Sequence, residues 1–142
     1  MKLVDSNVLI YAVNSSLRQH QPAFRWLTNA LSGSETVGLP WTSLLAFIRV
    51  STNPRVFATP ISVEDALSTS QRWLTSPAAV VVEPSIRHLS MLGELLTVAG
   101  TAGNLTSDAH LAALAREHGA DVVTFDRDLE RFGVTVVVPS CR

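Results

Sequence analysis

The amino-acid sequence predicts a three-layer α/β domain with a mainly parallel β-sheet. Segments with the apolar spacing of helices alternate with short apolar segments almost throughout the chain. The short segments are continuous apolar runs such as 80–82, which is typical of strands covered on both faces. A chain of 142 residues, 46% of them hydrophobic, is large enough for one such domain and its core. We therefore expect a single domain over residues 1–142.

The first half of the chain supplies two of the expected strands. Residues 2–4 form a short apolar strand that ends at Asp5, and residues 36–39 form a second strand, which Pro40 ends. The residue before Pro54 is biased away from the helical conformation, so the last helix of this half ends there. The expected helices of this half lie at residues 7–12, 22–31 and 41–53.

The second half continues the alternation. Ser62, with an acidic residue three positions later, predicts the start of a helix that extends to residue 74. Residues 79–82 predict a third strand. Thr106 or Ser107 is expected to cap a later helix, and Gly119 to end it. The other expected elements are a helix at 85–98, a helix at 108–118, a strand at 122–125, a short helix at 127–132 and a strand at 134–138.

The composition excludes several classes of protein. The formal net charge is −1, so no global positive field attracts nucleic acid. The single cysteine, Cys141, excludes a disulfide within the chain and a zinc site built from several cysteines. No segment approaches the roughly eighteen apolar residues that a membrane span needs, and the first residues lack the pattern of a signal peptide. We expect a cytoplasmic protein that does not associate with a membrane.

The mean hydropathy of +0.25 is high for a soluble monomer of this size. Apolar positions on the helices expected at 22–31 and 62–74 predict an exposed apolar surface, and such surfaces are often buried against another chain. We therefore expect a homodimer.

Four aspartates are candidates for a metal site. Asp5 and Asp126 each follow an expected strand, and Asp128 lies in the same loop as Asp126. Asp108 opens a helix. Ligands of open parallel sheets bind beyond the carboxyl ends of the strands, and four carboxylates gathered there would repel one another without a cation. Mg²⁺ prefers oxygen ligands and commonly combines one or two carboxylates with substrate phosphate oxygens, so the implied reaction is hydrolysis of a phosphate ester.

Each of these aspartates also has a purely structural interpretation. Asp5 and Asp126 are both placed to cap a following helix, and Asp108 in a first helical turn is favoured by the helix dipole. Asp128 alone is typical of a solvated acid in a first turn. A metal site is favoured because three independent junctions between elements would otherwise all need the same kind of cap.

Other groups of residues point less clearly to chemistry. His110 lies about 200° around its helix from Asp108, so a packing or surface role is favoured for this histidine. The other histidines are scattered without the spacing of metal ligands. The sequence also lacks the glycine pattern of a nucleophile elbow and the lysine of a P-loop.

Three segments together resemble the VapC toxins, the PIN-domain ribonucleases of prokaryotic toxin–antitoxin pairs. They are KLVDSNVLIYA at the start, LPWTSLLAFIRVSTNPRVF in the middle and NLTSDAHLAALAREHGADVVTFDRDLERF in the last third of the chain. The resemblance covers nearly the whole chain in the same order and spacing. It implies a PIN-like α/β/α fold and an endoribonuclease that depends on Mg²⁺ or Mn²⁺. It also implies inhibition by a VapB-like antitoxin.

The resemblance further implies roles for individual residues. Asp5 and Asp108 would be the principal metal ligands and, with Asp126, the catalytic residues. Asp126 and Asp128 would complete the acidic cluster, and Asn7 would help to hold the pocket.

The helix after the second strand departs from the common family pattern. Many members carry a glutamate there, whereas residues 42–53 contain no acid, so the choice between one and two metal ions stays open. The segment instead resembles a branch with Phe-x-Arg followed by Thr-Asn-Pro, here Phe47, Arg49 and residues 52–54. Arg49 either binds the scissile phosphate or forms a structural ion pair.

Two alternative functions stay open. A haloacid-dehalogenase-type phosphatase needs an Asp-x-Asp after a strand, with the second aspartate as general acid, but Asn7 occupies that place. A catalytically weak PIN-like module that binds RNA or protein would fit the missing helix acid, whereas the four aspartates favour an enzyme.

Overall fold

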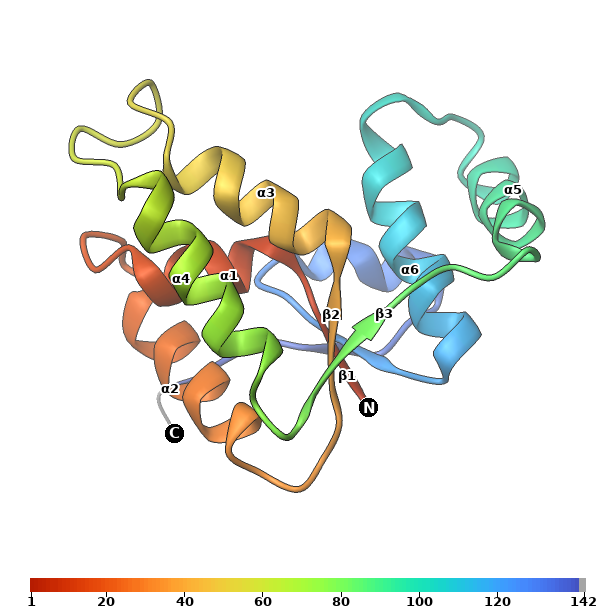
Figure 1. The fold of residues 1–142 in the computed structure, drawn as a ribbon. Coiled ribbons are helices and arrows are strands. Elements are labelled where there is room, and N and C mark those ends of the chain that lie inside the picture. The colour runs from red at the N-terminus through yellow and green to blue at the C-terminus, as the bar shows by residue number, and fades with distance from the viewer. Residues whose placement is uncertain (141–142) are drawn as a thin grey trace.

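A parallel five-stranded β-sheet lies at the centre of the computed structural model, which describes residues 1–140 (Figure 1). The strands are β1 (Lys2–Val4), β2 (Val37–Pro40), β3 (Ala79–Val82), β4 (Asp121–Val123) and β5 (Val136–Val137). Their order in the sheet is β3-β2-β1-β4-β5, and all neighbouring strands run parallel. The predicted three-layer α/β fold with a mainly parallel sheet is confirmed. Cys141 lies outside the described residues.

Helices cover both faces of this sheet. α1 to α4 lie on one face, and α6 lies on the other with α5 packed outside it (Figure 1). Among residues 1–140, no helix is long and apolar enough to cross a membrane. The α-helices are α1 (Ser6–Val13), α2 (His20–Leu31), α3 (Trp41–Ser51), α4 (Val63–Leu74), α5 (His88–Ala99) and α6 (Thr106–His118). The 3₁₀ helices are η1 (Gly103–Leu105) and η2 (Arg127–Phe132).

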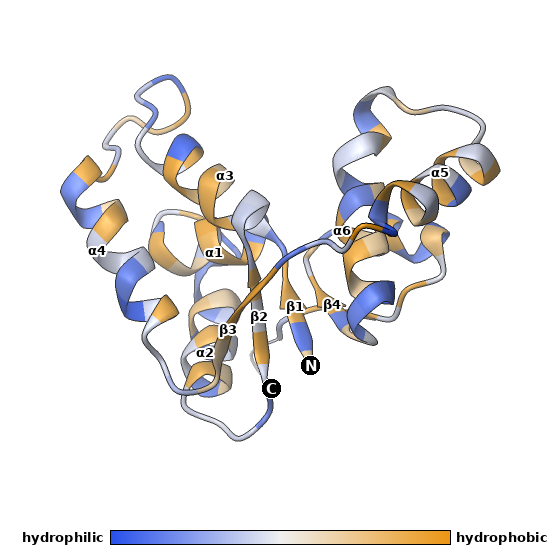
Figure 2. Ribbon diagram, turned by 45° about the vertical axis from the view of Figure 1, so that its right-hand side comes forward, coloured by the Kyte–Doolittle hydropathy of each residue, from blue (hydrophilic) through white to orange (hydrophobic). Residues whose placement is uncertain are grey.

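The central strand β1 joins the two halves of the core. Val4 packs in the cluster under α1 to α4, together with Phe47 of α3, whereas Leu3 packs in the cluster under α6. Successive side chains of a strand point to opposite faces, so both apolar residues of β1 are fully buried. Hydrophobic residues accordingly lie along the central strands β1, β2 and β4 (Figure 2). A buried strand of this kind holds whatever follows it, here Asp5, at a defined place.

The caps of two helices confirm the sequence prediction. The Ser62 hydroxyl accepts a hydrogen bond from the Asp65 backbone N–H at 3.0 Å and begins α4. Gly119 ends α6 in the left-handed conformation, with φ of +60°.

Two predicted helix starts are wrong. α5 begins at His88 and not at residue 85, because the Ser85 hydroxyl accepts the Arg87 backbone N–H in a turn that precedes the helix. α6 continues directly from η1, so neither Thr106 nor Ser107 is its cap.

The prediction that all strands are covered on both faces is wrong for β3. Val80 and Val81 are 39% and 43% exposed, because β3 is an edge strand that pairs with β2 alone. Apolar side chains are also exposed on the two helices to which the sequence assigned a dimer contact, among them Phe24 on α2 and Leu67 on α4. The homodimer stays a prediction.

The close contact of β2 with its neighbours supplies a test of the packing. A Cβ atom on Gly38 would lie 2.7 Å from Val82 Cγ2 and 2.9 Å from Leu3 Cδ1, whereas a Cβ atom on Gly93, within α5, would meet nothing within 4 Å. We expect Gly38→Ala to lower the free energy of unfolding by about 1–3 kcal/mol through overpacking. Gly93→Ala should raise it by roughly 0.5–1 kcal/mol, because alanine is the better helix former. Urea denaturation of both variants measures this, and changes of the same sign would contradict it.

Candidate active site

The carboxyl edge of the sheet brings the four predicted aspartates together. Asp5 follows β1, Asp126 and Asp128 lie in the segment after β4, and Asp108 lies in the first turn of α6. The pKa of Asp108 is raised first by burial and then by the charges of Asp126, Asp5 and Asp128, whereas Arg131 opposes this rise. Three other carboxylates are therefore close enough to act on Asp108, as the sequence predicted.

Asp5 is held at both carboxylate oxygens. Its Oδ1 accepts the Ser6 backbone N–H at 2.7 Å, which makes Asp5 the N-cap of α1. Its Oδ2 accepts the hydroxyl of Thr124 at 2.8 Å and the amide of Asn7 at 3.4 Å. Burial raises the pKa of Asp5, the bonds from Thr124 and Ser6 counteract this, and the charge of Asp126 raises the pKa further. The orientation of this carboxylate is thus defined by neighbours that favour its charged form.

Thr124 is a site residue that was not predicted from the sequence. The side chain is fully buried, and its Oγ1 donates to Asp5 while it accepts the Asn7 amide at 3.0 Å and the Asp126 backbone N–H at 3.0 Å. Asn7 Oδ1 in turn accepts the backbone N–H of Phe125 at 3.2 Å. The strand register contained the signal: Val4 pairs with Val123, so the residues that follow them, Asp5 and Thr124, lie side by side.

Asp126 caps the following helix and also lies near the other acids of the cluster. Its Oδ1 accepts the Asp128 backbone N–H at 2.9 Å and so caps η2, while its charge acts on both Asp5 and Asp108. Asp128 itself is exposed. The caps at Asp5 and Asp126 are therefore observed, and the functional role of these carboxylates stays a prediction.

The pocket at this edge of the sheet has a volume of about 400 Å³ and is lined by residues of α3 and α6. Asp5 and Asp108 line one side of it, and α3 lines the other through residues that include Thr42 and Arg49. No acid faces Asp5 and Asp108 from α3. Phe47 is buried in the core, with its ring centroid 4.8 Å from that of Trp73. The pocket is therefore acidic on one side and carries a single cationic side chain on the other.

Arg49 forms no ion pair with another residue of the 1–140 range that the structure describes. This favours the first of the two interpretations of Arg49, in which its guanidinium is available to an anion in the pocket.

The donor chemistry of the site fits a hard divalent cation. Burial and mutual repulsion raise the pKa values of Asp5 and Asp108, so ionising these carboxylates together costs free energy. A cation bound among them would offset that cost. Within residues 1–140, no three His, Cys, Asp or Glu side chains are already placed to hold a metal ion. Of the protein oxygens in the pocket, those of Asp5 and Asp108 are the carboxylate donors.

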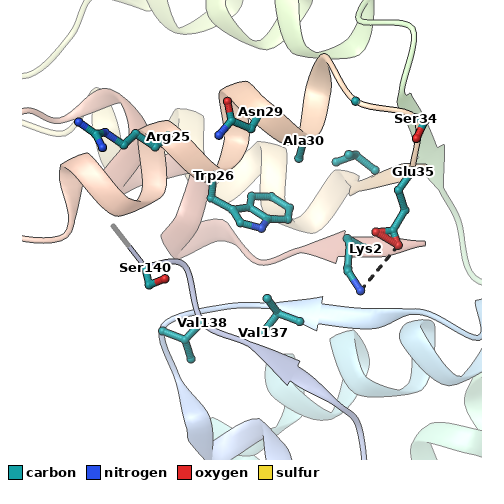
Figure 3. A pocket seen from close by; sticks show the side chains of 12 residues that line it. Lys2, Arg25, Trp26, Asn29, Ala30, Ser34, Glu35, Val137, Val138 and Ser140 are labelled. Carbon is teal, nitrogen blue, oxygen red and sulfur yellow. Dashed lines mark ion pairs between the residues drawn. The ribbon is translucent and has the colours of Figure 1, made fainter. Parts of the chain in front are cut away.

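A larger pocket of about 680 Å³ lies elsewhere, beside α2 (Figure 3). Its lining includes Trp26 and Lys2, and Lys2 is bound by Glu35 at 3.7 Å and Asp121 at 2.6 Å. None of the four clustered aspartates lines this pocket, so it is not the candidate active site.

The histidines form no part of the acidic pocket. His88 contacts Glu117 through Nδ1 at 3.0 Å and His110 through Nε2 at 2.8 Å, which ties α5 to α6. The packing role predicted for His110 is confirmed, while the pairing with His88 was not visible from sequence spacing.

The sequence matches a known family. A family model described as PIN domain matches residues 2–134. The chain is 49% identical to Ribonuclease VapC37 of Mycobacterium tuberculosis over 132 residues, which cover 93% of this chain and 92% of the relative. It is 40% identical to Ribonuclease VapC43 of the same species, again over 132 residues, covering 93% of this chain and 90% of the relative.

Solved structures show the same fold. The crystal structure of Mycobacterium tuberculosis VapC20, described as a Sarcin-Ricin loop cleaving toxin, matches with a TM-score of 0.73 at 19% identity and covers 98% of this chain and 100% of that chain. VapBC2 from Rickettsia felis, bound to a DNA fragment from its promoter, matches with a TM-score of 0.70 at 18% identity and covers 98% of both chains. At these identities the likeness establishes the architecture.

The raised pKa of Asp108 predicts how the metal-free protein responds to pH. A carboxyl group whose pKa is raised by folding stabilises the fold most below its ordinary value of 3.8, and this stabilisation is lost as the pH rises through the raised value. Asp108→Asn should therefore lose less stability than the wild type as the pH rises from 3.8 to neutrality. Urea denaturation in EDTA measures it.

Asp65→Asn is the matched control, because Asp65 also lies in a first helical turn but is exposed on α4. At neutral pH, Asp108→Asn should be the more stable of the two relative to the wild type. Added Mg²⁺ should raise the Tm of the wild type and of Asp65→Asn more than that of Asp108→Asn. An equal response of all three proteins to Mg²⁺ would remove Asp108 from the metal site.

Proposed function

The chain belongs to the PIN-domain family, and we propose that it is a VapC-type endoribonuclease that hydrolyses RNA phosphodiester bonds in the acidic pocket with a divalent metal ion. The observation that carries the proposal is the gathering of Asp5, Asp108, Asp126 and Asp128 at one edge of the sheet, opposite Arg49 on α3. The two named relatives, at 49% and 40% identity, are ribonucleases by name. Family membership also excludes the haloacid-dehalogenase-type phosphatase.

Asp5 and Asp108 are the proposed metal ligands, because both carboxylates line the pocket. Mg²⁺ is the proposed ion and Mn²⁺ the alternative, since both accept an all-oxygen donor set. When bound, such an ion supplies a nucleophilic hydroxide at neutral pH and neutralises charge that develops on the phosphate. Two lining carboxylates, with no acid on α3, suit a single ion, and the remaining ligands would be water and phosphate oxygens.

The protein's own groups orient the reactants. Thr124 and the Ser6 backbone N–H hold the two oxygens of Asp5, so this carboxylate does not reorganise when substrate enters. Asp126 is bound through its backbone to Thr124 and through Oδ1 to Asp128. None of the described hydrogen bonds uses Asp126 Oδ2, so we assign this oxygen to orienting the attacking water and accepting its proton.

Arg49 would bind the scissile phosphate. A phosphodiester that enters a pocket of carboxylates meets unfavourable charge, and one divalent ion offsets it only in part. Arg49 lines the same pocket from the opposite wall and offers two donors to a phosphate.

The biological role we propose is that of a toxin restrained by a VapB-like antitoxin. VapBC complexes are among the structures that share this fold. The homodimer inferred from the hydropathy is part of the same proposal, and the exposed apolar side chains of α2 and α4 are compatible with it.

The direct test of the function is cleavage of a single-stranded RNA by the wild type and by Asp5→Asn. We expect cleavage that requires Mg²⁺ or Mn²⁺ and stops in EDTA. Loss of one ligand should remove several kcal/mol of transition-state stabilisation, a decrease of about 100-fold or more. Asp65→Asn, the exposed acid on α4, should cleave like the wild type. Full activity of folded Asp5→Asn would refute the assignment. A wild type that binds RNA without cutting it would identify the chain as a binding module.

The role of Arg49 is tested separately. We expect Arg49→Ala to reduce RNA cleavage about tenfold or more, on the order of 1.4 kcal/mol in transition-state stabilisation. The Tm should change little, since Arg49 forms no ion pair within residues 1–140. Arg55→Ala, in the exposed segment after α3, is the control. A sharp fall in the Tm with normal cleavage by the folded fraction would mean that Arg49 is structural.

A further inference from the structure

A third pocket, of about 580 Å³, lies between the C-terminal end of α5 and the helix η2. Its lining is mostly apolar and includes Leu95, Val98 and Ala99 of α5, Leu105 of η1, and Phe132 of η2. Arg131 is the one charged side chain among the lining residues. The proposed cleavage chemistry uses none of these residues.

This pocket borders the acidic site. Leu105 directly precedes α6, whose first turn carries Asp108, and Arg131 lies in η2, the same short helix as Asp128. The charge of Arg131 acts on Asp108, which places the guanidinium within electrostatic range of the acidic cluster. Arg131 therefore links this pocket to the acidic site, because it lines the pocket and its charge also acts on Asp108.

The lining indicates what kind of group would fill the pocket. Both Phe132 and Val98 line the pocket; Phe132 is 5% exposed, whereas Val98 is 88% exposed. Burying that apolar surface against a flat apolar group is favourable. Arg131 forms no ion pair within the described residues, while Arg127 in the same helix is paired with Glu130 at 3.1 Å. The pocket thus offers an apolar surface next to a cation that is available to an anion.

A nucleotide has this combination of groups: a flat base and a phosphate. Proteins that read RNA sequence mostly bind bases that have left the stack, since paired bases in A-form RNA are hard to reach. We propose that this pocket binds the base of an unpaired nucleotide next to the scissile phosphate, with Arg131 binding a neighbouring phosphate. This proposal rests on the ribonuclease function above and makes the pocket a determinant of the cut site.

The experiment fills the pocket and measures base preference. Ala99→Phe places a ring at the exposed end of α5, and Leu89→Phe, at the other end of the same helix and outside the pocket lining, is its control. Arg131→Gln removes the cation, and Arg127→Gln is the matched control. Each protein digests a single-stranded RNA with randomised sequence in Mg²⁺, and the new ends are sequenced. Titration with the four nucleoside 5′-monophosphates in EDTA measures binding without cleavage.

We expect the wild type to prefer one base beside the cut, and Ala99→Phe to lose this preference. Loss of one base contact should reduce cleavage of the preferred RNA by about tenfold, while other RNAs are still cut. Arg131→Gln should weaken monophosphate binding, and both control variants should behave like the wild type. This result supports the proposal.

Other outcomes overturn it. An unchanged base preference in Ala99→Phe means that the pocket does not bind a base, and a changed mass in solution with unchanged preference means that a second copy covers it. If the wild type cuts no RNA, the ribonuclease function fails and the titration decides about the pocket. Monophosphate binding that Ala99→Phe abolishes then supports a nucleotide site, and absence of such binding refutes it.

Discussion

The pairing of β1 with β4 is the constraint on which the candidate site depends. Val4 lies opposite Val123, and both are fully buried, so a slip in register would expose one of the most buried parts of the core. The residues that leave these strands, Asp5 and Thr124, are therefore fixed side by side, and their hydrogen bond orients the carboxylate. Apolar packing is not directional, but by fixing the register of β1 and β4 it positions the hydrogen bond between Thr124 and Asp5 at the edge of the sheet.

The same arrangement buries carboxylates close enough together to repel one another. Burial and neighbouring carboxylates raise the pKa values of Asp5 and Asp108, so the folded chain holds these groups ionised at a cost. The core that surrounds Val4 and Leu3 supplies the stability that makes this cost tolerable. A cation or a phosphate-bound cation would relieve it, which links binding in the pocket to the stability of the fold.

The two walls of the pocket carry side chains of different charge. The wall formed by β1 and α6 carries the acids, whereas α3 presents Arg49 and short polar side chains and turns Phe47 into the core. The ring of Phe47 packs on Trp73 of α4, so this apolar residue of α3 is part of the packing between α3 and α4. The absence of an acid from α3 is compatible with a site for one ion that uses an arginine to hold the substrate.

Local sequence determined the α/β alternation, the cap at Ser62 and the four aspartates, because apolar spacing and capping depend on residues a few positions apart. Tertiary structure alone decided the role of Thr124, since its partners Asp5 and Asn7 are more than a hundred residues away along the chain. It also decided the exposure of β3 and the start of α5, which depend on strand order and on contacts between elements. The spacing of apolar residues indicates which residues are buried, but the pairing of strands far apart in the sequence determines which residues come into contact.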